Sequence, residues 1–480
     1  MKHLNYSKLL PLASLALLLL VTGCKKNISD PESPSQKNNT EVNSGGDKRF
    51  DLLGAGYNIS GKYANVESAQ NQVLDVEKIF SNNILNIKKN DGAQTYFTSN
   101  FGENAVDYSL KLSQSITAGL GDIKVFGGEL STSYNSTDSF YSKYAYASIS
   151  MMITQRHLRI DVSRDELMRN YLTDKFKSDL NSLSNADLIA RYGTHVLADI
   201  TLGARFDLNY RAETNSTKRT EAVKSGAVVK GLFGVFGMTA NFEEDKSLAT
   251  SNFNQTLSYR TQGGDGSKGA IGEISLDASS NTKINIGTWQ SGCTLDNATL
   301  IQIEKNGAIP LWELIEDPAK SSAVQSYILQ YLRDKQISLT YEKINVYEYF
   351  SAQGKDHFFA TDRSLDGNSY WSFSGAKFKA LNAPAPGAVP AYSYYSEQAR
   401  DHVILIDKTP ALQNPSYWNV GGAIAFYVFP TQQPGTIPVY AFYHTADRSH
   451  ILAADAGLIN YLNTTSGWRR DGILFYAYPN

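Results

Sequence analysis

A change of hydrophobic period between residues 163 and 212 constrains the fold of this chain more than any other feature. In residues 163–183 apolar side chains recur at helical spacing behind a Ser163–Glu166 capping box, which predicts one helix. A second short helix is expected at 185–192, with Gly193 as its C-cap. In residues 205–212 apolar and polar residues then alternate, as they do again at 252–260. Long antiparallel strands with one wet face, preceded by helices, predict an α+β fold.

The first 24 residues predict export and a lipid anchor. Basic residues precede a short apolar run, which is the layout of a secretory signal peptide. The run ends in Val-Thr-Gly-Cys24, which resembles the bacterial lipobox, so Cys24 is expected to be acylated and to become the mature N-terminus; an ordinary leader with a chance cysteine is the alternative. Residues 1–23 are then a lipoprotein signal peptide and residues 24–49 a flexible stalk. We expect an outer-membrane lipoprotein, at the cell surface or released from it.

Composition excludes several classes of function. The chain carries 45 basic and 47 acidic residues with no run of like charge, so a nucleic-acid partner has no electrostatic support. No nucleophile elbow, phosphate-binding loop or His-x-x-x-His pair occurs, and none of the seven histidines stands at short metal-ligand spacing. We therefore expect no enzyme activity, no catalytic residue, no cofactor and no metal.

One short motif points to a family. Tyr192-Gly193-Thr194-His195 is followed, after Val196 and six residues, by Gly203-Ala204. This pattern resembles the signature of the membrane-attack-complex/perforin (MACPF) family, with Val196 in place of an aromatic residue and Ala204 in place of the second glycine. Together with similar elements elsewhere, the resemblance covers residues 50–340.

The resemblance implies that Tyr192, Gly193, Thr194, His195 and Gly203 are structural and support a bent antiparallel sheet flanked by helical clusters. The residues alone agree for His195, because a catalytic histidine needs a nucleophile or acid beside it and a third group that orients it. A catalytic base and a metal ligand are the alternatives for this side chain.

Members of this family carry two segments that refold from helices into membrane hairpins, and the sequence offers two candidates. Residues 109–130 fit a strand and a helix equally well. Residues 221–245 contain glycines that weaken either structure, which favours a segment that changes conformation. Segments that never move are the alternative. The expected membrane-inserting residues are Leu110, Leu112, Ile116, Leu120, Leu232, Phe236, Met238 and Phe242.

Insertion as strands would require many copies of the chain. Backbone groups in lipid must be satisfied internally, which for strands means a closed β-barrel ring, and two hairpins supply only four strands per chain. Membrane lipid and further copies of this chain are therefore the expected partners.

Residues 341–480 hold three repeats. In each repeat an aromatic residue stands seven positions before a histidine, and a tryptophan follows. Units that cannot bury their aromatic rings singly suggest a closed, β-trefoil-like all-β domain, with a propeller-like or linear array as the alternatives. The repeated residues are expected to hold the core together, with ligand binding as the alternative. They are His357, His402, His450, Trp371, Trp418 and Trp468.

Two functions of different class follow. The first is a lipid-anchored or surface-released pore-forming protein, a toxin against competing bacteria. Its C-terminal module would choose the target through a glycan or an outer-membrane protein receptor. The second is a non-lytic surface adhesin or glycan-binding lipoprotein on the same scaffold.

Overall fold

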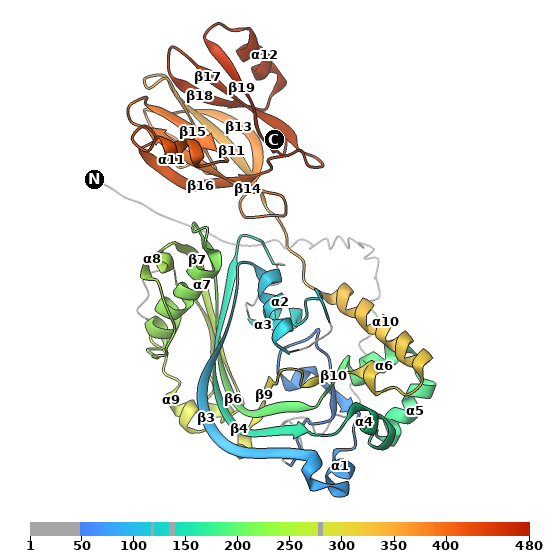
Figure 1. Ribbon diagram of the computed structural model, residues 1–480. Coiled ribbons are helices and arrows are strands. Elements are labelled where there is room, and N and C mark those ends of the chain that lie inside the picture. The colour runs from blue at the N-terminus through green and yellow to red at the C-terminus, as the bar shows by residue number, and fades with distance from the viewer. Residues whose placement is uncertain (1–48, 117–119, 134–139, 277–281) are drawn as a thin grey trace, which may run out of the picture. The chain divides into compact units, whose positions relative to one another are not determined.

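A computed structural model describes residues 49–480, apart from residues 117–119, 134–139 and 277–281 (Figure 1). The predicted signal peptide, Cys24 and the stalk up to residue 48 lie outside the described residues, so the lipid anchor stays a prediction. Residues 49–340 are α+β, and residues 341–480 are dominated by strands. The fold class is the predicted one.

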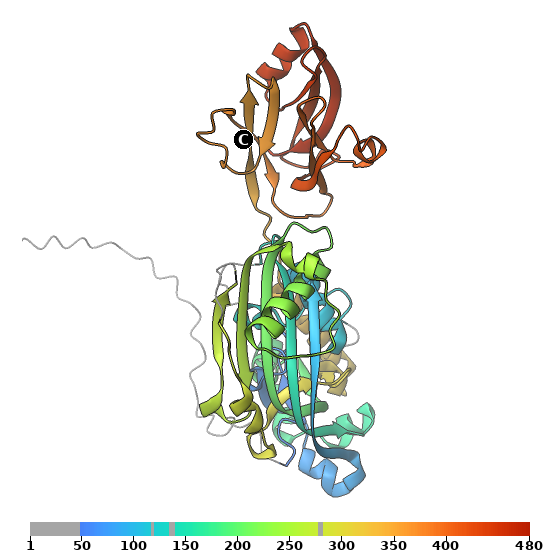
Figure 2. The same ribbon diagram turned by 90° about the vertical axis from the view of Figure 1, so that its left-hand side faces the viewer.

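A six-stranded antiparallel sheet forms the centre of residues 49–340 (Figures 1 and 2). Its strands run in the order β3-β4-β6-β7-β8, and β9 pairs with the first part of β6. Three of them, each of 16 residues, are far longer than the usual strand of about five or six. The strands are β3 (Ile87–Gly102), β4 (Ala145–Ile160), β6 (Asp199–Thr214), β7 (Asn252–Gln262), β8 (Ile271–Ser275) and β9 (Thr299–Ile303).

Irregular pairing accompanies the bend of this sheet. The register shifts on β3 between Asp91 and Gln94, and on β4 between Thr154 and Arg156. An extra residue on one strand of a pair bends that strand and increases its twist. Gly203 of β6 pairs at this point, and a Cβ on it would lie 2.1 Å from the carbonyl oxygen of Ile153. Gly203 therefore serves the bend by close packing.

Alternate residues of β4 and β6 give the sheet two chemically different faces. On β6, Phe206 and Leu208 belong to an apolar cluster, whereas Arg205, Asp207 and Asn209 point to a polar side. The sequence predicted this alternation. The prediction that the polar face is wet was wrong, because all three polar side chains are at most 5% exposed. Helices in the connections between strands cover both faces (Figures 1 and 2).

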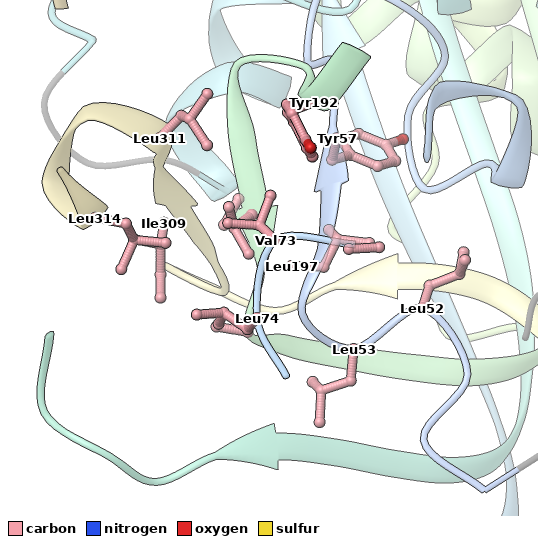
Figure 3. Packing of buried hydrophobic residues seen from close by; sticks show 14 of the residues in the cluster. Leu52, Leu53, Tyr57, Val73, Leu74, Tyr192, Leu197, Ile309, Leu311 and Leu314 are labelled. Atoms are coloured by element: carbon pink, nitrogen blue, oxygen red, sulfur yellow. The ribbon is translucent and has the colours of Figure 1, made fainter. Parts of the chain in front are cut away.

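A second, four-stranded sheet carries the largest apolar core (Figure 3). Leu53, Tyr57, Val73, Leu197 and Leu311 are fully buried in it, although they come from distant parts of the chain. Burial of each such side chain is worth about 1.5–3 kcal/mol. The strands run in the order β10 (Ala308–Pro310), β5 (His195–Leu197), β1 (Ala55–Tyr57) and β2 (Ala69–Gln72).

Helices pack their apolar sides on this core. The single helix predicted at 163–183 was wrong: it is two helices, because Leu172 bridges to Leu74 and Thr173 caps a new helix. The predicted helix before Gly193 is present, and Gly193 takes a positive φ of 71°. The helices are α1 (Val76–Asn82), α4 (Arg164–Asn170), α5 (Asp174–Ser182), α6 (Asn185–Tyr192) and α10 (Pro318–Lys335); α9 (Gly287–Ser291) lies elsewhere in this part.

Each repeat of residues 341–480 contributes three antiparallel strands, in which the first strand pairs with the other two. Short helices α11 (Thr409–Gln413) and α12 (Ala456–Thr464) connect the strands. The strands are β11 (Lys343–Ser351), β12 (Asp356–Ala360) and β13 (Ser372–Leu381); β14 (Val389–Ser396), β15 (Asp401–Leu405) and β16 (Val420–Val428); and β17 (Ile437–His444), β18 (Ser449–Ala453) and β19 (Trp468–Ala477).

The three repeats close around one core. β13 pairs with β16, and two isolated bridges link the first and second repeats to the third, Lys379–Tyr478 and Phe429–Tyr476. Phe378, Phe426 and Phe475 meet there, with ring centroids 5.9, 5.6 and 6.2 Å apart. This closure excludes the linear array that the sequence left open. The finer trefoil assignment stays a prediction.

Candidate membrane-insertion segments

Both predicted membrane segments contain helices and lie between neighbouring strands of the central sheet. The first joins β3 to β4 and holds α2 (Ala105–Ile116) and α3 (Gly127–Ser133). The second joins β6 to β7 and holds α7 (Arg219–Gly226), the π-helix η3 (Ala227–Val235) and α8 (Lys246–Thr250). Figures 1 and 2 show α2 and α3 inside the bend of the sheet and α7 and α8 outside it.

The first segment rests on the polar face of the sheet. The Tyr108 hydroxyl of α2 donates to Ser148 of β4 at 2.8 Å, and Glu129 of α3 lies 3.8 Å from Arg260 of β7. A cavity of about 450 Å³ lies between these helices and the sheet, and its lining includes Asp207. Water can replace these polar contacts when the segment detaches. Three side chains of the same segment, however, are buried in the largest apolar core: Leu120, Ile123 and Phe126.

Serines on the buried side of α2 fix its connection to α3. Ser109 donates to the carbonyl oxygen of Val125 at 2.6 Å, and the amide of Val125 donates to Ser113 at 2.9 Å. In a strand these serines would lie on the opposite face from Leu110 and Leu112. Helix and strand would therefore hide different sides of the same segment.

The second segment rests on the apolar face. Val228 and Leu232 of η3 are fully buried in the cluster that the sheet provides. The Phe236 ring packs edge-on against Phe206 at 4.8 Å and against Tyr259 at 5.4 Å. Burial of apolar surface at about 25 cal/mol per Å² therefore holds this segment on the sheet, whereas the contacts of α2 and α3 with the sheet include hydrogen bonds and an ion pair.

The structure divides the predicted membrane-inserting residues by burial. Leu120, Leu232 and Phe236 are buried, whereas the side chain of Ile116 lies outside the described residues. A water-soluble form of an inserting segment must hide such apolar groups, and this arrangement does so in large part; their insertion stays a prediction. The half-buried members are Leu110, Leu112, Met238 and Phe242.

His195 of the signature is fully buried. Its Nδ1 lies 3.0 Å from the Thr194 hydroxyl, which itself donates to the carbonyl oxygen of Tyr57. Nδ1 therefore carries the proton, and Nε2 has no hydrogen-bond partner among the described residues. Burial lowers the pKa of His195 to about 3, so the ring is neutral, and it packs edge-on against Trp312 at 6.0 Å. This geometry suits a scaffold residue.

Tyr192 depends on a residue that the sequence analysis missed. Its hydroxyl donates to Asp179 of α5 at 2.8 Å, and Lys175 and Arg191 donate to the same carboxylate at 2.7 Å each. The Lys175 hydrogen bond, followed by those from Arg191 and Tyr192, lowers the pKa of Asp179 to about 2 despite its burial. The i,i+4 spacing of Lys175 and Asp179 was the available signal.

Aspartates that the sequence analysis missed tie the repeats of the C-terminal part together. Nδ1 of His402 donates to Asp356 of the preceding repeat at 2.6 Å, and Nδ1 of His450 donates to Asp401 at 2.6 Å. Each aspartate directly precedes the histidine of its own repeat. Its position in the sequence therefore gave no signal of the hydrogen bond to the histidine of the next repeat.

Two further properties concern the described part of the chain as a whole. No helix in it is both long and apolar enough to cross a bilayer. Its His, Cys, Asp and Glu side chains form no group of three or more that could hold a metal ion.

Two known family models match most of the chain. Residues 46–340 match the MAC/Perforin domain. The chain belongs to the MAC/perforin family. This is a family of pore-forming proteins whose members are generally not enzymes. Residues 335–478 match a domain of unknown function, DUF5648. No curated protein sequence matches the chain at a significant level.

Two solved structures are similar to the chain. GNIP1Aa from Chromobacterium piscinae is 16% identical, with a TM-score of 0.50 over 82% of this chain and 84% of that protein. A protein with a MAC/Perforin domain from Bacteroides thetaiotaomicron is 14% identical, with a TM-score of 0.45 over 74% of this chain and 69% of that one. At these identities the likeness concerns the fold alone.

Proposed function

We propose that this MAC/perforin protein forms pores, by inserting residues 109–130 and 221–245 into a target membrane as two β-hairpins. The observation that supports this most is topological. Strands β3, β4, β6 and β7 are consecutive neighbours in one antiparallel sheet. Each candidate segment joins two of these neighbours, so simple extension of the strands makes a hairpin without any strand crossing.

The chemistry of the segments supports the same proposal. A membrane strand needs about 9–11 residues with lipid-facing and lumen-facing positions alternating. In residues 236–243 apolar Phe236, Met238 and Phe242 alternate with polar residues such as Thr239 and Asn241. In water the apolar members pack against the sheet; in the bilayer they would face lipid.

A closed ring of many chains completes the proposal. Four strands from one chain leave unpaired edges that lipid cannot satisfy, so neighbouring copies must pair with them. We place the chain on the outer membrane through acylated Cys24, as a toxin against competing bacteria that acts without enzyme chemistry. The C-terminal module supplies the choice of target.

The alternative is a non-lytic adhesin on the same scaffold. The observation that favours it is the set of exposed aromatic rings on the C-terminal module, among them Tyr370 and Phe373 at 40% and 43% exposure. Such rings suit binding to a surface whether or not a pore follows.

A reversible lock on the first segment tests pore formation. The Ser258 hydroxyl of β7 donates to the backbone carbonyl of Ser133 of α3, so these neighbouring positions are the pair to test for a disulfide that would hold α3 on the sheet. Cys293 is first changed to Ser to leave a single thiol pair. We expect the oxidised Ser133→Cys/Ser258→Cys protein to release no dye from vesicles of phosphatidylethanolamine and phosphatidylglycerol, and reduction to restore release.

The control is Ser258→Cys alone in the same Cys293→Ser background, which should release dye whether oxidised or reduced. Equal release by the locked and unlocked double variant would refute insertion of the first segment. If every form binds the vesicles and none releases dye, the non-lytic adhesin is the function that remains.

A further inference from the structure

One aromatic stack recurs at all three seams between neighbouring repeats of the C-terminal module. At each seam a tryptophan of one repeat lies beside the histidine of the next, with ring centroids 5.8, 6.1 and 6.2 Å apart. The same histidine stacks on an aromatic ring of its own repeat at 4.3 to 4.7 Å. Because it occurs at every seam, this stack contributes to closure of the module together with the phenylalanine core. The pairs are Trp371–His402, Trp418–His450 and Trp468–His357.

The seam between the first and second repeats carries polar groups beyond this stack. His402 donates from Nδ1 to the buried Asp356, which leaves Nε2 available to a ligand. Tyr370 stands edge-on to Trp371 at 5.3 Å. Burial raises the pKa of Tyr395, and Tyr370 is among the groups that act on it electrostatically. The set is Asp356, Tyr370, Trp371, Tyr395, His402 and the exposed Arg400.

The seam between the second and third repeats reproduces this set position by position. His450 donates from Nδ1 to the buried Asp401, and its side chain is 23% exposed, as is that of His402. Tyr417 stands edge-on to Trp418 at 5.0 Å. The set is Asp401, Tyr417, Trp418, Tyr443, His450 and the exposed Arg448.

The seam between the third and first repeats lacks the tyrosines and the aspartate and has Lys355 in place of the arginine. Gly467 stands where the other seams have the tyrosine before the tryptophan, Phe350 where they have the second tyrosine, and Ser449 where they have the aspartate. The Ser449 hydroxyl is buried without a hydrogen-bond partner in the described part of the chain, and His357 bonds instead to Glu348 of its own repeat at 2.5 Å.

This third seam serves as an internal control. At this seam the aromatic stack is joined by an ion pair between Lys355 and Asp447 at 2.5 Å, so closure of the module does not require two tyrosine hydroxyls and an aspartate-held imidazole. The other two seams keep all of these groups together at the surface. Their combination points to a ligand rather than to the stability of the module.

The chemistry of the shared set fits a saccharide. A sugar ring offers an apolar C–H face that packs on tryptophan and tyrosine, while its hydroxyls exchange hydrogen bonds with imidazole, phenol and guanidinium groups. A lipid chain would leave these polar groups without partners, at a cost in binding free energy.

We propose that these two seams are equivalent saccharide-binding sites, built around Trp371 and His402 and around Trp418 and His450. Two sites on one module would bind a repetitive surface glycan far more tightly than either site alone. The inference rests on the proposed role of this module in choosing the target, and it gives that role a ligand class and a location.

Titration of the full chain with methyl glycosides of glucose, galactose, mannose and N-acetylglucosamine tests the sites, by calorimetry and tryptophan fluorescence. We expect at least one glycoside to bind with a millimolar dissociation constant and a stoichiometry of two. Tyr370→Ala and Tyr417→Ala should each remove one site, and the double variant should weaken binding at least tenfold. Tyr461→Ala, at a 59% exposed position on α12, is the matched control and should bind as the unmodified chain does.

The inference is overturned if no glycoside binds at about 50 mM, well above the millimolar range expected of a single sugar. It is also overturned if the double variant, with an unchanged melting temperature, binds as the control does. Dye release from vesicles without glycolipid reports pore formation independently. If the unmodified chain binds sugar but releases no dye, pore formation is refuted and the two saccharide sites remain.

Discussion

His195 is held in place by contacts that depend on residues far away in the sequence, which no local sequence pattern could predict. The sequence predicted a scaffold residue, because it offers no neighbouring group for chemistry, and the buried, neutral ring agrees with that interpretation. The hydrogen bond that fixes its tautomer depends on Thr194, whose hydroxyl is oriented by Tyr57. Tyr57 lies 137 residues earlier in the chain, so tertiary folding alone brings it near.

The titration of His195 predicts acid sensitivity. Its pKa is about 3 in the folded chain and 6.5 in the unfolded chain, so between these values only the unfolded chain binds the proton. The free energy of unfolding should therefore fall as pH drops from 6.5 towards 3, by up to about 1.4 kcal/mol per pH unit from this group. His195→Asn, whose amide can replace Nδ1, should remove that part of the slope in urea titrations at pH 4 to 7. An unchanged slope would contradict this, and loss of activity at unchanged stability would point to chemistry.

Gly203 gives a second test, because two glycines stand at the same bend in different surroundings. A Cβ on Gly203 would meet the backbone of Ile153 at 2.1 Å, whereas one on Gly92 would meet nothing within 4 Å. We expect Gly203→Ala to lower the free energy of unfolding by about 1–3 kcal/mol, the usual cost of overpacking. Gly92→Ala should leave it nearly unchanged in the same denaturation experiment. Equal effects would show that the bend does not depend on this contact.

The periodicity of the sequence predicted the helices and strands better than it predicted what packs against them. The strands at 205–212 and 252–260 and the helix before Gly193 could be read from local spacing, because each is long or well capped. The break at Tyr171 could not, since the pairing of Leu172 with Leu74 decides it. Nor could the polar face of β6 be assigned to α2 and α3, because its burial depends on how the connections fold back.

The second insertion segment allows a matched pair of charge variants. Met238 is half-buried and Thr239 exposed in the irregular stretch after η3, so the resting fold should tolerate a lysine at either position. In a membrane strand Met238 would face lipid, where Lys costs about 2–4 kcal/mol per chain, and Thr239 would face the lumen. Met238→Lys should therefore abolish conductance across planar bilayers, while Thr239→Lys should retain it. Equal conductance in both variants, each shown to bind membrane, would exclude this strand register.

The C-terminal repeats show what internal symmetry can predict for a whole domain. The regular spacing of aromatic residues, histidines and tryptophans was enough to predict three units and a closed core, and Phe378, Phe426 and Phe475 form that core. Which seam departs from the pattern could not be predicted, because the replacement of aspartate by Ser449 matters only once the neighbour that it faces is known.

The membrane anchor is predicted to depend on one residue, Cys24. Acylation at Cys24 would add chains worth about 0.8 kcal/mol for each buried CH₂ group. Cys24→Ala should therefore give unprocessed or soluble protein in cell fractionation, because the acylated residue is lost. Recovery of this variant in the membrane fraction, with its leader removed and resistant to salt extraction, would refute the lipoprotein assignment.

Assembly into a closed ring makes a prediction that a single chain cannot. If every chain of a ring must contribute its hairpins, one locked chain disables the whole ring, so activity falls as a high power of the unlocked fraction. Mixtures of oxidised Ser133→Cys/Ser258→Cys protein with the Cys293→Ser chain should then release far less dye than the unlocked fraction alone would give. Energy transfer between labelled chains on the vesicles must show that the two forms assemble together. Given that mixing, a proportional decline in release would mean that each chain acts by itself, which four strands per chain cannot do in lipid.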